Sequence, residues 1–346
     1  MNASPHSNTI KDSETGHWVN HTPLSVRPYL QLSRLDRPVG YWLLTLPGWI
    51  GLAFATLGYG FAWSDLKWAM LIFIGAIAMR GAGCTYNDIV DQDLDAQVER
   101  TALRPLPAGT VTTKQAWTWV FLQCFIGLAV LLCLPRLAQI ISLCSIPLVA
   151  AYPFMKRITW WPQIWLGLTF NWAVLVAFAA KTGEVNTATF LLYIALMFWT
   201  IGYDTIYACQ DMEDDAMVGI KSTARRFGDS VKKGVLVCYA GCLIFIAFAT
   251  LKILGEPLSL TDGTEAIRHM SNRIACGFLL LPFTLHLLTQ VKELRPDHSE
   301  TSLKIFKSNK SAAFLLIIGF VLATTLHYGQ IYNWLSFTDT DLSVLQ

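Results

Sequence analysis

The sequence predicts an all-helical membrane protein, a bundle of about nine transmembrane helices, and three observations support this fold class. Hydrophobic residues make up 53% of the 346 residues and charged residues only 14%, whereas soluble domains carry about 25% charged residues. The mean hydropathy is +0.43. Several apolar stretches reach the roughly 20 residues that a helix needs to cross a bilayer. A disordered chain and an ordinary soluble enzyme are therefore both excluded.

Nine apolar segments qualify as spans. The first is the clearest, because no charged residue occurs between Val39 and Trp63. The fourth and sixth are short, so eight or ten spans remain as alternatives. We expect one membrane domain at 23–337, a disordered tail at 1–22 and a short tail at 338–346. The predicted spans cover residues 39–61, 67–87, 115–135, 137–155, 160–180, 187–209, 233–252, 273–291 and 312–335.

Basic residues are concentrated on one side of the predicted membrane domain. With nine spans, nineteen of the 26 Lys and Arg residues lie on the side of the N-terminus and six on the other. The positive-inside rule places the N-terminal side in the cytosol or an equivalent compartment. The net charge of +2 gives no indication of nucleic acid binding. The eight cysteines form no CxxC pair and no Cys/His cluster, so we interpret them as small buried hydrophobic residues.

Two acidic clusters lie where a span meets this basic side. Five of the 24 acidic residues lie at 88–99 and five at 204–215. By its spacing, each cluster places three carboxylates on one face of a helix. These carboxylates are Asp88, Asp91 and Asp95, and Asp204, Asp211 and Asp215. Because carboxylates this close repel each other and resist desolvation, they need cations. Ligands that are all oxygen favour Mg²⁺; a solvated acidic loop is the alternative.

Basic residues accompany both clusters. Arg100 and Arg104 follow the first cluster and Lys221 follows the second, while Lys156 and Arg157 end the fourth span. Carboxylates with Mg²⁺, together with Arg and Lys side chains, suit the binding of a diphosphate. For each basic residue alone, anchoring at the membrane surface is the alternative.

In these motifs the sequence resembles the UbiA superfamily of intramembrane prenyltransferases. The resemblance points most to its 4-hydroxybenzoate polyprenyltransferase branch and to fungal relatives that prenylate aromatic polyketides. The matching segments are 34–38, 81–95, 100–109, 152–157, 161–163, 203–211 with 215, and 219–223. The resemblance implies nine helices around a central cavity. It also implies that Asn87, Asp88, Asp91 and Asp95, with Asp211 and Asp215, hold Mg²⁺ against the diphosphate of a prenyl donor.

The implied reaction ionises an allylic diphosphate, and an electron-rich aromatic ring attacks the carbocation. The catalytic candidates are Asp211 as the first choice of base, Asp204 as the second, and Lys156. The substrate-binding candidates are Arg37, Arg80, Asn87, Arg100, Arg104, Arg157, Asn171, Tyr207 and Lys221. Aromatic residues either line a tunnel for the prenyl tail or serve only in packing. These aromatic residues are Trp165, Phe170, Trp172, Phe198 and Trp199.

The first 38 residues contain four Lys or Arg residues together with three acids, which matches a mitochondrial presequence poorly. We therefore expect an endomembrane enzyme that transfers farnesyl to a phenolic polyketide acceptor, with its active site on the cytosolic face. The alternative is 4-hydroxybenzoate polyprenylation in ubiquinone biosynthesis. A transporter with acidic ion sites and a catalytically silent scaffold are alternatives from other classes. The expected partners are the donor, the acceptor and the bilayer, with no obligate protein partner.

Overall fold

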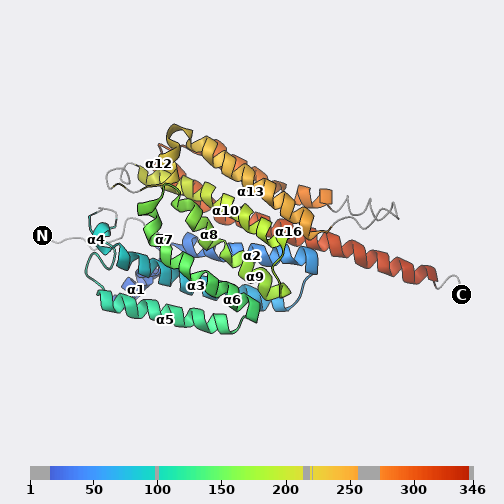
Figure 1. Ribbon diagram of the computed structural model, residues 1–346, viewed down its shortest axis with the longest axis horizontal. Coiled ribbons are helices and arrows are strands. Elements are labelled where there is room, and N and C mark those ends of the chain that lie inside the picture. Colours follow the sequence, from blue (N-terminus) through green and yellow to red (C-terminus); the bar gives the residue numbers. More distant parts are fainter. Residues whose placement is uncertain (1–15, 98–100, 213–218, 220, 256–272, 343–346) are drawn as a thin grey trace.

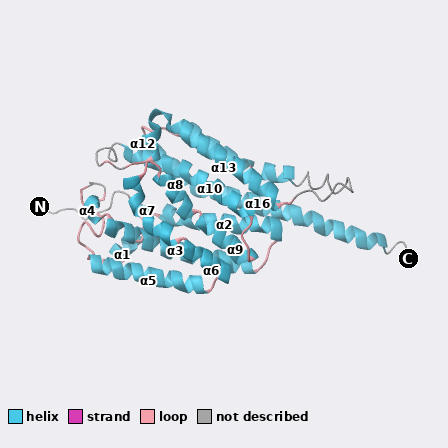
Figure 2. Ribbon diagram, viewed as in Figure 1, coloured by secondary structure: helices cyan, strands magenta, loops and turns pink. Residues whose placement is uncertain are grey.

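The computed structural model is a helical bundle (Figures 1 and 2). It describes residues 16–97, 101–212, 219, 221–255 and 273–342. Within these residues, nine helical segments are long and apolar enough to cross a membrane, which confirms the predicted number. They are Pro38–Tyr59, Ser64–Val90, Thr113–Leu132, Arg136–Met155, Pro162–Thr182, Thr187–Ala208, Thr223–Ile253, Arg273–Glu293 and Ser299–Tyr328.

The described helices divide between two halves of the chain. The N-terminal half contains η1 (Trp18–His21), α1 (Arg27–Leu32), α2 (Pro38–Tyr59), α3 (Ser64–Val90), α4 (Gln92–Asp95), α5 (Thr113–Leu132), α6 (Arg136–Cys144), α7 (Ile146–Ile158), α8 (Pro162–Phe170) and α9 (Trp172–Thr182). The C-terminal half contains α10 (Thr187–Ala208), η2 (Cys209–Asp211), α12 (Thr223–Phe227), η3 (Gly228–Ser230), α13 (Val231–Ile253), α15 (Leu281–Glu293) and α16 (Ser299–Leu342).

The largest hydrophobic core joins α2, α9, α10, α13, α15 and α16. Phe54 of α2 packs against Phe178 of α9 and Phe320 of α16. Trp199 of α10 is fully buried and donates from its ring nitrogen to Asn309 Oδ1 of α16 at 2.9 Å. In Figure 1, α3, α5 and α6 lie on the opposite side of α2 from α13. The cavity described below is lined by α3, α5 and α6 and by α2, α9, α10 and α16 of the hydrophobic core.

Two of the spans are interrupted halfway. The fourth changes from α6 to α7 at Ser145, beside Pro147, which has no backbone N–H to continue the helix. The fifth changes from α8 to α9 at Asn171. The buried Asn171 amide donates to Gly167 O at 2.8 Å, to Leu196 O at 3.1 Å and to the hydroxyl of Thr200 at 2.8 Å. These bonds provide partners for the amide N–H groups of Asn171, which find no water inside a membrane.

The domain limits differ from the predicted ones at both ends. The predicted disordered tail at 1–22 includes η1, in which Val19 is fully buried. The last helix, α16, continues to Leu342, past the predicted end at residue 337. Its C-terminal part extends beyond the other helices in Figure 1.

Candidate active site

A cavity of about 1130 Å³ lies inside the bundle and changes from polar to apolar along α3. Its polar end is lined by Arg34, Arg37, Asn87, Asp88, Asp95, Arg104, Lys221 and Lys307. Its apolar end is lined by Leu71, Ile72, Gly75, Val130, Leu131, Leu134 and Val176. This arrangement suits an anion that carries a hydrocarbon tail.

The first acidic motif lies at the C-terminal end of α3 and in α4. Asp88 is fully buried, and Asp91 and Asp95 are 1% and 9% exposed. Although α3 ends at Val90, the N–H groups of Asp91 and Asp95 still bond to carbonyls four residues earlier. The predicted helical face is therefore nearly preserved, and Asn87, Asp88 and Asp95 line the cavity.

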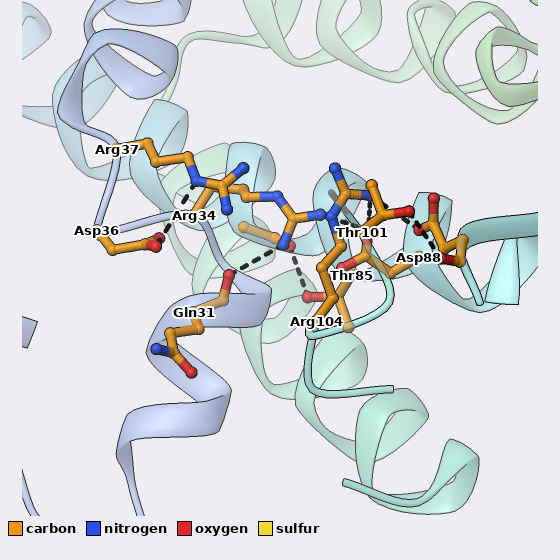
Figure 3. A network of polar contacts seen from close by, with 10 residues as sticks. Gln31, Arg34, Asp36, Arg37, Thr85, Asp88, Thr101 and Arg104 are labelled. Atoms are coloured by element: carbon orange, nitrogen blue, oxygen red, sulfur yellow. Dashed lines mark hydrogen bonds and ion pairs between the residues drawn. The ribbon is translucent and has the colours of Figure 1, made fainter. Parts of the chain in front are cut away.

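Two arginines pair with the buried carboxylates that line the cavity (Figure 3). Arg34 Nη2 donates to Asp88 Oδ1 at 2.5 Å. Arg104 Nη1 lies 2.8 Å from Asp95 Oδ2 and 3.5 Å from the same Asp88 oxygen. The two guanidinium groups reach these carboxylates from different segments of the chain, α1–α2 and the connection before α5. They offset the cost of burying like charges side by side.

A third ion pair connects α7 to the same motif. Arg157 Nη2 lies 2.6 Å from Asp91 Oδ1, and the Asp91 side chain is fully buried while that of Arg157 is 45% exposed. Lys221 Nζ donates to the carbonyl of the next residue in α7, Ile158, at 3.2 Å. Of these two predicted substrate-binding cations, Lys221 lines the cavity, whereas Arg157 and its partner Asp91 do not.

The Arg34 side chain is a part of the site that sequence reasoning missed. It counted only as one of the basic residues, although it lies in a segment that carries the family resemblance. Its backbone has φ 55°, the left-handed region that residues other than glycine rarely adopt. The preceding Ser33 is fixed to α5, because its hydroxyl donates to Gln123 Oε1 at 3.0 Å and accepts from the Trp119 ring nitrogen at 2.8 Å.

Burial and neighbouring charges shift the pKa values of two site residues outside the membrane spans. Burial raises the pKa of Asp95, although the nearby Arg104 acts in the opposite direction. Burial alone would lower the pKa of Arg34, but the carboxylates around it, Asp88 foremost, raise the pKa overall. The Arg34 guanidinium is therefore a permanent charge, and Asp95 ionises more readily when a cation is near it.

A second polar group lies deeper in the cavity. Arg80 lines it, with its guanidinium carbon 5.3 Å from the ring centre of Phe170. Its Nε is buried and has no hydrogen-bond partner among the described residues. Asp204 of α10 lines the same cavity. The cavity therefore offers a cation, Arg80, for an anionic group of a substrate, and a proton acceptor, Asp204.

Other predicted residues take different positions. Arg37 lines the cavity and forms an ion pair with Asp36 at 3.6 Å, and Tyr207 lines it with its ring 4.5 Å from that of Phe306. Asn171, a substrate-binding candidate, is absent from the cavity lining, because its amide is engaged at the α8–α9 break. Arg100 and Asp215 lie outside the described residues, as do the side chains of Lys156 and Asp211.

The five aromatic candidates divide between the cavity and the helix interfaces. Phe170 and Trp172 line the cavity, as the tunnel interpretation expects. The other three do not. Trp165 donates to Leu148 O of α7, Phe198 stacks on Phe245 of α13 with ring centres 5.6 Å apart, and Trp199 bonds to Asn309. For these three residues the packing interpretation holds.

The described half of the candidate magnesium site fits a hard cation. Its donors are all oxygen atoms, and Asp88 Oδ2 is buried without a hydrogen-bond partner among the described residues. Asn87 and Asp95 lie beside it on the cavity wall. No three His, Cys, Asp or Glu side chains of the described part converge as a complete set of ligands.

Comparison with known proteins agrees with this geometry. The model of the UbiA prenyltransferase family matches residues 44–261. A 4-hydroxybenzoate polyprenyltransferase, mitochondrial, from Aedes aegypti is 40% identical over 321 residues, covering 92% of this chain and 68% of the relative. A 4-hydroxybenzoate geranyltransferase 1 from Lithospermum erythrorhizon is 42% identical over 248 residues, covering 70% of this chain and 78% of the relative.

A solved structure shares the fold. The UbiA homolog from Archaeoglobus fulgidus bound to GPP and Mg²⁺ superposes with a TM-score of 0.62 at 18% identity, covering 86% of this chain and 99% of the homolog. The family match, the close relatives and the cavity together exclude a transporter or a scaffold. The chain belongs to the UbiA prenyltransferase family and is a multi-pass membrane prenyltransferase.

Proposed function

We propose that the protein transfers a prenyl group from an allylic diphosphate to a ring carbon of 4-hydroxybenzoate, with Mg²⁺ as cofactor. The cavity supports this proposal most, because one end gathers acidic and basic side chains and the other is apolar. The names of the relatives support this acceptor over the phenolic polyketide that the sequence favoured. The Archaeoglobus homolog, bound to GPP and Mg²⁺, supports the donor and the cation.

The polar end would hold the donor by its diphosphate. Asn87, Asp88 and Asp95, with Asp91 and the second acidic motif, would hold Mg²⁺, which neutralises the charge that develops on the leaving diphosphate. Lys221 and Arg104 line the same end and would bind diphosphate oxygens directly. The apolar walls below would exclude water from the allylic cation, which water would otherwise capture.

The acceptor would occupy the region between the two polar groups. The buried Nε of Arg80 has no hydrogen-bond partner within the described part of the chain, and Arg37 offers a second cation for the benzoate carboxylate. Asp204 faces the cavity and would accept the proton that the phenol or the ring loses. Asp211, the first choice of base from the sequence, is the other candidate, and its side chain lies outside the described residues.

The relatives also bear on location. Those from Aedes aegypti and Bos taurus are named mitochondrial, which is against the endomembrane location that the sequence favoured. We propose a mitochondrial membrane, with the N-terminal, basic side of the bundle carrying the active site. Imaging of the tagged protein with markers for both compartments tests this location.

The proposed reaction is tested by incubating the purified protein in vesicles with 4-hydroxybenzoate, allylic diphosphates and Mg²⁺. We expect prenylated product and equal release of diphosphate, both lost on addition of EDTA. Asp88→Asn should abolish turnover. Asp93→Asn is the matched control, because Asp93 belongs to the same segment but is exposed and absent from the cavity lining. Activity that persists in EDTA, or equal rates in both variants, would contradict the metal site. Exclusive prenylation of a phenolic polyketide would instead support the acceptor that the sequence favoured.

A further inference from the structure

We infer that four apolar side chains close the deep end of the cavity and set the length of the prenyl chain that it holds. This inference rests on the proposed function, because it concerns the tail of the same donor. The four residues, here called the floor, are Leu71 of α3, Leu131 of α5, Leu134 of the connection between α5 and α6, and Val176 of α9.

The floor is backed by a packed cluster. Leu71, Leu131 and Val176 pack against a group of buried residues to which Leu134 itself belongs. The other buried members, Ala138, Ala179 and Ala180, are at most 5% exposed and do not line the cavity. The cavity therefore ends where the side chains of α6 and α9 meet.

The depth of the cavity follows from α3, which runs without a break from Ser64 to Val90. Both Asp88 at the polar end and Leu71 at the floor line the cavity. They are seventeen residues apart, which corresponds to about 25 Å at 1.5 Å per residue. This is the distance available to a tail whose diphosphate is held beside Asp88.

The same distance can be expressed in prenyl units. Each unit adds four carbon–carbon bonds, and an extended chain advances about 1.2 Å per bond, so one unit spans roughly 5 Å. A tail of about five units therefore extends from Asp88 to the floor. A longer tail has no room below Leu71 and must place its remaining units elsewhere, without the contacts of the cavity.

Two opposite substitutions test this inference. Ala76 lines the cavity twelve residues from Asp88, or about 18 Å along α3. Ala76→Phe should leave room for geranyl but shorten the space for a five-unit tail. The double substitution Leu71→Ala and Leu134→Ala should deepen the cavity. Ile74→Ala is the control, because Ile74 lies on the same helix, is 41% exposed and does not line the cavity.

The measurement is the ratio of kcat/KM for long donors to kcat/KM for geranyl diphosphate, with 4-hydroxybenzoate as acceptor. We expect Ala76→Phe to lower the ratio for a five-unit donor about tenfold or more, because an apolar pocket rejects surplus methylene groups by such factors. The deepened variant should raise the ratio for six-unit and longer donors. Ile74→Ala should leave every ratio unchanged.

Each variant contains its own folding control, because turnover of geranyl diphosphate shows that the site is assembled. Binding of unreactive prenyl thiodiphosphates of the same lengths gives a second readout that does not depend on turnover. Length profiles that stay the same in both cavity variants would overturn the inference while leaving the proposed function intact. Absence of transfer from every donor in the wild type would instead overturn the proposed function.

Discussion

Replacement of Arg34 by methionine tests whether this arginine holds the first acidic motif in place. The side chain of Arg34 is 9% exposed and that of Asp88 is fully buried, so their ion pair is shielded from water. Methionine keeps an unbranched chain but removes the charge. The left-handed backbone at residue 34 is equally unfavourable for arginine and methionine, so the comparison isolates the guanidinium.

The expected size of the effect follows from the contacts. Removing one partner of a buried ion pair typically costs about 3–5 kcal/mol, because the remaining charge stays buried without compensation. Arg104 Nη1 lies 3.5 Å from the same Asp88 oxygen and compensates in part. We therefore expect Arg34→Met to lower the free energy of unfolding by about 3 kcal/mol.

The assay is unfolding by SDS in mixed micelles without Mg²⁺, on the wild type, Arg34→Met, Asp88→Asn and the double variant. Because Asp88→Asn removes the carboxylate that needs compensation, the double variant should lose less stability than the two single losses added together. Arg34→Gly is a useful comparison, because glycine relieves the backbone strain but removes the same charge. A loss below about 0.5 kcal/mol in Arg34→Met, or strict additivity in the double variant, would refute the reasoning.

Two further predictions concern the support of Arg34 and the acceptor region. A Cβ added at Gly81 would lie 1.8 Å from Gln123 Oε1, so Gly81→Ala should break the Ser33–Gln123 hydrogen bond and cost about 1–3 kcal/mol of unfolding free energy. In a Gln123→Ala background the cost of Gly81→Ala should fall, because only the 3.0 Å contact with Ser33 Cβ remains, and an undiminished cost there would contradict this cause. Arg80→Gln should raise the KM for 4-hydroxybenzoate about tenfold or more, since hydrogen bonds to charged groups are the stronger ones. The KM for the donor should stay unchanged; equal rises in both would show a general disturbance of the cavity instead.

The sequence predicts the number of spans well, because length and hydropathy decide which segments can cross a membrane. It also predicts which residues lie at the end of α3, since the spacing of Asp88, Asp91 and Asp95 matches a helical face. The sequence does not predict the helix breaks at Ser145 and Asn171. Asn171 occurs in an apolar stretch and has the appearance of a site residue. Its hydrogen bonds to α10 depend on the Leu196 carbonyl and the Thr200 hydroxyl, which no sequence pattern brings near.

Arg34 shows a second limit. In the sequence it is one basic residue among many on the N-terminal side of the membrane. Its role depends on the connection between α1 and α2, which turns at a positive φ and places its guanidinium against α3. That placement requires Gly81, since any side chain at this position would occupy the space of Gln123 and Ser33. The relevant contacts join residues about 50 to 90 positions apart, and periodicity reports only on neighbours within a helix.

The separation of charge and apolar surface along α3 explains how one cavity can serve both parts of a prenyl diphosphate. Buried carboxylates at one end are tolerated because Arg34 and Arg104 pair with them. The same helix carries only apolar lining residues from Leu71 to Met79, where no charge could be compensated. A substitution near Asp88 should therefore affect every donor alike. A substitution near Leu71 should affect donors according to their length, and this contrast separates the two ends in a single set of assays.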